Sequence, residues 1–263
     1  MKLTIIARTC SKKSVSQGQQ RIVDCSREEM ILKCIDSLIK SANNCYHDIT
    51  VKVLDDNSDA DFLIELNSIL QKSTHPTYFK NLEVEGFNYS AHAQFQEGLA
   101  AEELVYFVED DYFHTDDAID AMVSFFESSI TDDYKKFNMM AIYPYDCAHR
   151  YWPGLIDPAR IFYHGNRYWR TITHTANTVM LHTNVVRNFW KLFESIAVNY
   201  PNIKESDSLN LLYSNLVTHG GPVACFSPIP SVANHISYVN EPPNILTKKF
   251  TNWKEDWDNY EPM

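Results

Sequence analysis

Three consecutive carboxylates follow an apolar segment in the middle of the chain, and they are the residues best suited to chemistry. The segment reads ELVYFVEDDYFH over residues 103–114, so Glu109, Asp110 and Asp111 come directly after its apolar run. Side chains of like charge at this spacing oppose one another's ionisation. We therefore expect a compensating cation close to these three acids.

Polar residues also follow two other apolar segments of strand length. Residues 3–7 run into Arg8 and Thr9, and a second segment runs into Asp55 and Asp56. In open parallel sheets, ligands bind at the carboxyl ends of the strands. Acids that simply form turns explain any one of these segments. The three segments together favour a binding site at one edge of the sheet.

The elements that must position these residues alternate over about the first 130 residues. Residues 26–42 show helical spacing, and Ser26 with Glu29 forms a capping-box pattern. A short strand is expected over residues 82–86, and a helix whose pattern Gly98 weakens follows it. The alternation predicts a mostly parallel sheet flanked by helices. Residues 144–174 show little periodicity, and residues 149–171 are expected to form a long loop. One helix is expected over residues 184–196, and the tail from Asn240 is expected to be extended.

Composition limits the kinds of partner. The chain has 263 residues, 44% of them hydrophobic, and a formal net charge of -11. Length and hydrophobic content favour one globular domain or two closely packed ones. The negative charge argues against nucleic acid and anionic membranes, which need a basic footprint. A small anionic ligand stays compatible if a metal ion and a few arginines reverse the sign locally.

The cysteines and the hydropathy pattern indicate a compartment. The six cysteines form no C-x-x-C pair, which favours reduced thiols. No apolar run approaches the roughly 20 residues of a membrane span. The apolar stretch at the N-terminus is too short for a signal peptide. We expect a soluble, cytoplasmic protein without a transmembrane segment.

The acidic cluster suits a hard divalent cation. Mg²⁺ and Mn²⁺ prefer carboxylate oxygens and often complete their coordination with substrate phosphates. Such an ion would relieve the repulsion among Glu109, Asp110 and Asp111. It would also present positive charge to a diphosphate in an otherwise acidic protein.

The segments LTIIART, LDDNS and EDD, in this order and spacing, resemble the GT-A glycosyltransferases, which use nucleotide sugars. In that family a DxD motif holds a divalent metal on the donor diphosphate, and here EDD stands in its place. The resemblance implies that Asp111 binds the metal, while Glu109 and Asp110 contact the sugar, the ribose or a metal-bound water. It also implies that donor contacts come from the first two strand ends, at Arg8, Thr9, Asp55 and Asp56.

A catalytic base is implied by the later segment NIKESDSLNLLY. Inverting members of the family place a carboxylate near the start of a helix, usually in an adjacent ED pair. Here Ser206 separates Glu205 from Asp207, and we favour Asp207 because the helical pattern begins there. An inverting transfer needs a carboxylate to remove the proton of the acceptor hydroxyl. The alternative is that Asp207 only caps the helix.

His235 is the second metal ligand that the resemblance implies. It lies in SPIPSVANHIS, after a strand and a proline-flanked turn, where many metal-dependent members carry a late histidine. Imidazole is a softer ligand than oxygen, so this residue favours Mn²⁺ over Mg²⁺. The alternative is an ordinary structural histidine, one of ten in the chain.

Five arginines outside the strand ends also bear on the expected site. Residues 149–171 carry four of them among tyrosines and tryptophans, and these could cover the diphosphate as a mobile loop or pin a surface loop. The four are Arg150, Arg160, Arg167 and Arg170. Arg27 is expected to be a surface residue in the first turn of its helix.

The sequence thus predicts a single GT-A-like, Rossmann-like α/β domain. Residues 1–130 would bind the nucleotide, and the irregular residues 131–263 would bind the acceptor. The predicted activity is metal-dependent, inverting transfer of a sugar from a UDP, GDP or dTDP donor to a hydroxyl of a glycan or another acceptor. Two alternatives stay open: a nucleotidyltransferase that makes sugar nucleotides, and a non-catalytic carbohydrate-binding relative. The first usually needs a glycine-rich loop that is absent after residue 7.

Overall fold

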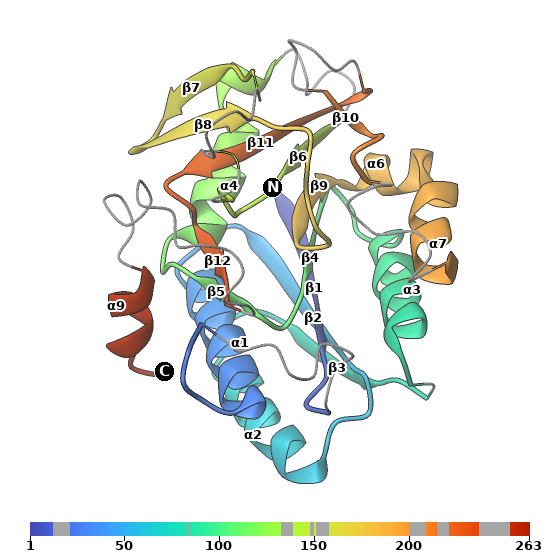
Figure 1. Cartoon of the computed structure of the whole chain (residues 1–263), viewed down its shortest axis with the longest axis vertical. Coiled ribbons are helices and arrows are strands. Elements are labelled where there is room, and N and C mark those ends of the chain that lie inside the picture. Colours follow the sequence, from blue (N-terminus) through green and yellow to red (C-terminus); the bar gives the residue numbers. More distant parts are fainter. Residues whose placement is uncertain are drawn as a thin grey trace.

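The structure is a computed structural model that describes residues 1–12, 22–83, 85–132, 139–147, 150, 158–199, 209–214, 221–236 and 253–263. A mixed sheet runs through it, with strands in the order β3-β2-β1-β4-β9-β6-β11-β8-β7 and with β10 paired to β11. Helices cover both faces of this sheet (Figure 1). The predicted α/β class is therefore confirmed.

The first half of the sheet is parallel, as the alternating pattern predicts. Its strands are β1 (Lys2–Thr9), β2 (Asp48–Asp55), β3 (Thr77–Asn81) and β4 (Leu104–Val108). The connecting helices are α1 (Arg27–Asn43), α2 (Ala60–Leu70) and α3 (Phe87–Gly98). Because these strands run the same way, their carboxyl ends meet at one edge, and Thr9 lies opposite Asp55.

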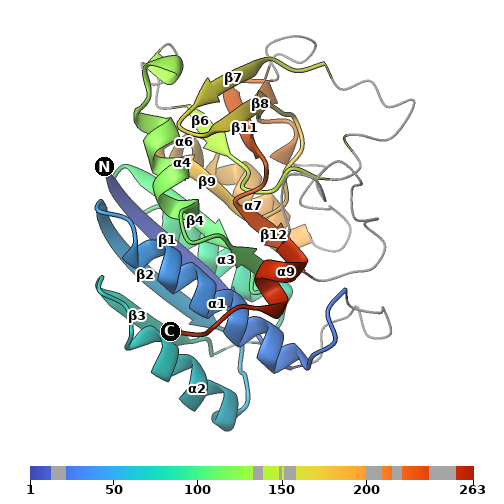
Figure 2. The same cartoon turned by 90° about the vertical axis from the view of Figure 1, so that its left-hand side faces the viewer.

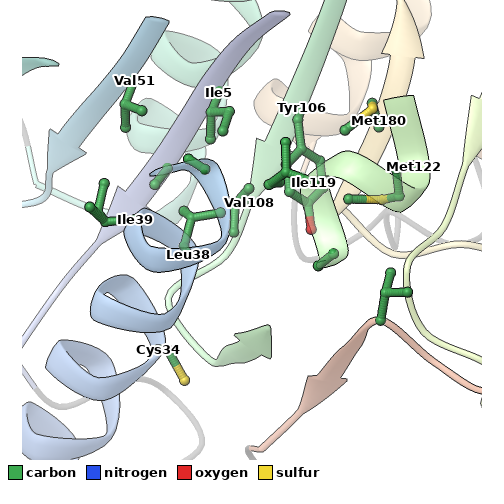
Figure 3. Close-up of a cluster of buried hydrophobic side chains, with 14 of the residues drawn as sticks. Ile5, Cys34, Leu38, Ile39, Val51, Tyr106, Val108, Ile119, Met122 and Met180 are labelled. Atoms are coloured by element: carbon green, nitrogen blue, oxygen red, sulfur yellow. The ribbon is translucent and has the colours of Figure 1, made fainter. Parts of the chain in front are cut away.

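Helix α1 begins where the sequence places its cap. The Ser26 side chain accepts from the Glu29 backbone N–H, and the Glu29 carboxylate accepts from the Ser26 N–H. Leu38 and Ile39 of the helix lie against the strand residue Ile5 in a buried cluster (Figure 3). Fully burying a side chain of this size contributes about 1.5–3 kcal/mol.

Alternation along β1 sends successive side chains to two cores. Ile5 belongs to the core covered by α1, α2, α4 (Ala118–Glu127) and α9 (Trp253–Asp258). Ile6 belongs to the core covered by α3, α6 (Thr183–Asn188) and α7 (Trp190–Asn199). This two-sided burial explains why the strand reads as a continuous apolar run.

The second half mixes strand directions. Its strands are β6 (Met140–Ile142), β7 (Ile161–His164), β8 (Arg167–Thr171), β9 (Val179–His182), β10 (Tyr213–Ser214) and β11 (Val223–Ile229). Strand β9 runs antiparallel between β4 and β6 and so joins the two halves. A separate two-stranded sheet pairs β5 (Tyr112–His114) with β12 (Ala233–His235). One turn of 3₁₀ helix, Ser129–Thr131, follows α4.

Three local predictions were wrong. The strand expected over residues 82–86 is β3, which ends at Asn81; it is an edge strand with mostly exposed residues, so its hydrophobic pattern is weak. The loop expected over residues 149–171 contains the β7–β8 hairpin, and β8 also pairs with β11, so this segment forms part of the sheet. The segment expected as one helix after β9 is divided into α6 and α7.

The described end of the chain packs on α1 (Figure 2). Helix α9 lies against it, with Lys33 Nζ 4.4 Å from the centre of the Trp257 ring. Tyr260 donates its hydroxyl proton to Asp36 at 2.7 Å. The tail expected to be extended is therefore helical over Trp253–Asp258.

None of the six cysteines forms a disulfide bond. None of the described helices combines the length and the apolar character needed to span a bilayer. The cytoplasmic location stays a prediction.

Gly98 allows α3 to approach β4 closely, which yields a prediction. A Cβ at residue 98 would lie 2.5 Å from Cζ of Phe107, a buried ring held between Phe95 and Phe193. Gly98 ends the helix, so little helix propensity is gained by replacing it. We expect Gly98→Ala to lower the free energy of unfolding by about 1–3 kcal/mol in urea titrations, because overpacking costs that much.

The matched test is Phe107→Leu in both backgrounds. The smaller side chain should be tolerated better in the Gly98→Ala background than beside the native glycine, since the added methyl occupies part of the space. Additive effects of the two substitutions would contradict the proposed contact.

Candidate functional site

The three consecutive acids lie at the carboxyl edge of the parallel strands, and each contacts a cationic or titratable side chain from a different element. They directly follow β4, and their partners come from β1, α1 and β12. The pairs are Glu109 with Arg8, Asp110 with Arg27, and Asp111 with His235. The compensation expected from the sequence is thus available within the chain.

Arg8 links the ends of β1 and β4. Its Nη2 lies 3.3 Å from Oε1 of Glu109, and the Arg8 side chain is 9% exposed. The guanidinium also lies 4.4 Å from the centre of the Phe87 ring and contacts the Phe87 carbonyl and the Ser90 hydroxyl. Arg8 therefore holds α3 and the acidic cluster at the same edge.

Arg27 holds Asp110, which corrects the expectation that Arg27 is a surface residue. Its Nη2 lies 3.1 Å from Oδ2 of Asp110, and its Nε donates to the Cys10 carbonyl at 2.9 Å. The Cys10 N–H donates to the same carboxylate oxygen at 3.0 Å. Burial raises the pKa of Asp110 to about 6; Arg27 opposes the rise and Asp111 adds to it. Protonation of this acid at a pH below about 6 would relieve part of the repulsion.

Asp111 and His235 meet because β5 pairs with β12. Nε2 of His235 lies 3.1 Å from Oδ2 of Asp111, and the Ile236 N–H donates to the Asp111 carbonyl at 2.8 Å. The imidazole stacks on the Tyr112 ring with centroids 4.9 Å apart. A carboxylate oxygen and an imidazole nitrogen at this separation suit neighbouring positions in the coordination shell of Mn²⁺ or a similar ion.

Thr9 and Asp55 are fully buried and bond to each other. The Thr9 hydroxyl donates to Oδ1 of Asp55 at 2.8 Å, and the Ser58 hydroxyl and N–H donate to the same carboxylate at 2.7 Å. These contacts hold the turn after β2. A direct ligand contact from Thr9 or Asp55 stays a prediction.

Asp56 fixes the start of α3. Both carboxylate oxygens accept from the Gly86 N–H, at 3.0 and 3.1 Å. Gly86 has a φ of 118°, a conformation that other residues rarely adopt, and Asn57 beside Asp56 has a φ of 56°. Asp56 thereby sets the entry of α3, the helix that also carries Phe87 and Ser90.

Two sequence-derived assignments concern residues that the structure does not describe. Glu205 and Asp207 lie outside the described residues, so the choice of base stays a prediction.

Two of the four arginines in the expected loop over residues 149–171 contact other parts of the fold. Arg167 donates to Asp117, the N-cap residue of α4, and Arg150 donates to the His174 carbonyl at 2.7 Å. Both thus hold described parts of the fold together.

Gln94 holds together the strands that lead to the site, and the sequence analysis missed it. It is fully buried on α3, and its Nε2 donates to the carbonyls of Ile6 and Val108 at 2.8 and 3.0 Å. It therefore joins β1 and β4 just before their polar ends. The sequence feature that could have indicated this role is a glutamine on the apolar face of the helix, close to Ala91 and Phe95.

The sequence matches the family model described as glycosyl transferase family 2 over residues 22–191. The match begins just before α1 and ends in α7, so it includes the three acids but neither Glu205, Asp207 nor His235. No curated protein matches the chain.

Two solved structures resemble the chain at low sequence identity. S. aureus TarS 1–349 in complex with UDP-GlcNAc is 15% identical, with a TM-score of 0.48, covering 91% of this chain and 56% of that chain. The mannosyltransferase PcManGT from Pyrobaculum calidifontis, in complex with GDP-Man and Mn²⁺, is 11% identical, with a TM-score of 0.48 and coverages of 85% and 56%. The chain spans about half the length of these proteins. Likeness at this level assigns neither donor nor acceptor.

His114 lies on β5, the strand that directly follows Asp111, and it leads to a prediction about how stability depends on pH. Its ring is buried between the Tyr106 hydroxyl, 2.8 Å from Nε2, and the Tyr112 carbonyl, 3.0 Å from Nδ1. Burial lowers the pKa of His114 to about 3, although the bond to Tyr112 opposes this. The unfolded chain takes up this proton near pH 6.5, so stability should fall as pH drops from about 6.5 toward 3.

The contribution of one such group has a slope of about 1.36 kcal/mol per pH unit within that window. We expect His114→Gln to flatten the dependence of unfolding free energy on pH by up to this amount between pH 4 and 6, measured by urea titration at each pH. Equal slopes in the two proteins would show that His114 charges readily in the folded state.

Proposed function

The chain belongs to glycosyl transferase family 2, and from this premise we propose that it transfers a sugar from a nucleotide-diphosphate donor to an acceptor hydroxyl with inversion and with a divalent metal. Residues 1–130 would bind the donor, and residues 131–263 would supply most of the acceptor site. The proposed donors carry UDP, GDP or dTDP, and the proposed acceptor is a glycan or another hydroxyl compound.

The observation that carries this proposal is the meeting of Asp111 and His235. They lie 124 residues apart in the chain, yet their side chains approach to 3.1 Å at the edge where the acidic cluster lies. Two donors of the types that Mn²⁺ accepts would hold the ion at this edge. When bound, the ion supplies positive charge to the diphosphate as it leaves.

Arg8 and Arg27 would support the donor from the same edge. Their guanidinium groups already contact Glu109 and Asp110, and they are mostly buried. A diphosphate entering here would meet positive charge in an otherwise acidic protein. Glu109 and Asp110 would then contact the sugar, the ribose or a bound water, as the family resemblance implies.

Asp207 would remove the proton of the acceptor hydroxyl, with Glu205 as the alternative base. Inversion requires the acceptor oxygen to attack the anomeric carbon from the face opposite the leaving diphosphate. A carboxylate positioned beside the acceptor makes that oxygen more nucleophilic. Asp55, Asp56 and Thr9 would shape the nucleotide site, either by contact or by holding its turns.

Family membership favours sugar transfer over the nucleotidyltransferase alternative. The non-catalytic alternative has a specific observation behind it, because every acid of the cluster already has a partner in the chain. A protein of that kind would bind a nucleotide sugar and release no nucleotide. Turnover separates the two functions.

Donor binding tests the metal assignment. The melting temperature is measured with UDP, GDP or dTDP, each with and without Mn²⁺, and one nucleotide should raise it only when Mn²⁺ is present. Asp111→Asn should abolish that increase. It should also lower kcat/KM for nucleotide release from the matching nucleotide sugar at least about 100-fold, since metal charge stabilisation amounts to several kcal/mol.

Asp48→Asn is the matched control, because Asp48 is exposed at the opposite end of β2. It should retain both the increase and the turnover. A metal-dependent increase that persists in Asp111→Asn would overturn the assignment of this ligand. Binding that is intact in the native protein, with no turnover of any donor and acceptor tried, would support the non-catalytic alternative.

The choice of base is tested by single substitutions. We expect Asp207→Asn to lower kcat by about 10²–10⁴-fold while donor affinity stays near native, because the base acts only in the chemical step. Glu205→Gln should have a much smaller effect on kcat. The reverse ranking would assign the base to Glu205, and two small effects would reject this segment as its source.

A further inference from the structure

A second group of metal-binding side chains lies at the opposite edge of the sheet. Cys45 follows α1, His47 precedes β2, and Asp120 lies in the first turn of α4. One ligand atom from each residue lies within 4.8 Å of the others. Strand β1 separates this group, which we call the amino-edge cluster, from the acidic cluster by roughly 25 Å, its own length.

The ligand types in the amino-edge cluster differ from those of the acidic cluster. A thiol, an imidazole and a carboxylate are the set that Zn²⁺ prefers, with bonds of about 2.0–2.3 Å. Tetrahedral bonds of that length place ligand atoms roughly 3.5 Å apart. Ligand atoms within 4.8 Å of one another therefore need to approach by at most about 1.3 Å, which side-chain rotation can provide.

Burial supplies an independent reason to expect a cation. Cys45 is 3% exposed and His47 is 8% exposed, while Asp120 is half-buried and gives access from solvent. Nε2 of His47 is buried and has no hydrogen-bond partner among the described residues. Such a nitrogen is costly to bury unless it bonds to something.

A second carboxylate lies beside the cluster, since Glu127 Oε2 is 3.6 Å from Nε2 of His47. The positively charged amine of Met1 lies 3.1 Å from Nδ1 of His47 and 3.3 Å from Glu127, so it offsets part of this negative charge.

We propose that Cys45, His47 and Asp120 bind a zinc-type divalent cation that ties the α1–β2 connection to α4. A water or Glu127 would complete the shell. The ion would stabilise the edge of the fold at which β1 and β2 begin, where Figure 2 shows the N-terminus near α4. It would take no part in the reaction proposed at the other edge, which is a separate hypothesis.

Cobalt(II) is the probe, because thiolate coordination gives a near-ultraviolet charge-transfer band that oxygen ligands do not give. The reduced, chelator-treated protein is first given excess Mn²⁺ to occupy oxygen-ligand sites and is then titrated with Co²⁺. We expect the band to saturate at one equivalent and to disappear on addition of Zn²⁺. Zn²⁺ should also raise the melting temperature.

The variants identify the ligands. Cys45→Ser should abolish the band. Asp120→Asn should weaken Co²⁺ binding at least about tenfold, because even the loss of a residue that only hydrogen-bonds to a metal ligand typically costs that much. Cys25→Ser, at a half-buried cysteine elsewhere, is the matched control and should retain the band. Circular dichroism checks that each variant folds.

A native protein without the band, or a band that survives in Cys45→Ser, would overturn the proposal and leave an ion-pair network in its place. A band lost in Cys25→Ser but kept in Cys45→Ser would assign the thiolate elsewhere and overturn it equally. None of these outcomes depends on nucleotide binding or turnover, so the proposed glycosyltransferase function is tested separately.

Discussion

The need to compensate three adjacent acids at the end of a buried strand constrains the rest of the structure. Glu109, Asp110 and Asp111 would repel one another without partners, and a mostly buried charge left alone costs about 3–5 kcal/mol. Their partners come from the end of β1, the start of α1 and the end of β12. The fold must therefore bring three distant segments to one edge of the sheet, and the capping box of α1 and the β5–β12 pairing place two of them there.

This compensation has a consequence for binding. The acids already have partners within the chain. A divalent ion and a diphosphate that bind at this edge would therefore replace existing ionic contacts with new ones. The arginines that neutralise Glu109 and Asp110 are also the nearest positive charges for a phosphate. The proposed function and the apo stability of this edge thus depend on the same side chains, and pre-existing ion pairs keep them oriented at little further entropic cost.

Parallel strands also give the sheet two chemically different edges. Carboxyl ends carry the hard oxygen ligands of the acidic cluster, together with the arginines. At the amino ends, the connection after α1 carries a thiol and an imidazole beside α4. Since ligand type selects the metal, the two proposed sites would bind different cations. The polarity of the strands keeps the two groups a full strand length apart.

The sequence by itself determined the parallel half of the fold and the gathering of polar residues at its carboxyl edge, because strand and helix periodicity and the Ser26 cap are local properties. It also paired Asp111 with His235 through family resemblance, and the structure brings these two residues into contact. Only the tertiary structure decided that Arg27 turns from the helix surface to Asp110, that Gln94 joins β1 to β4, and that residues 161–171 form a hairpin within the sheet. It alone also brought Cys45 and His47 against Asp120, which comes much later in the chain. Such contacts join residues distant in sequence, and their free energy depends on burial and on the charges brought alongside, which no local pattern encodes.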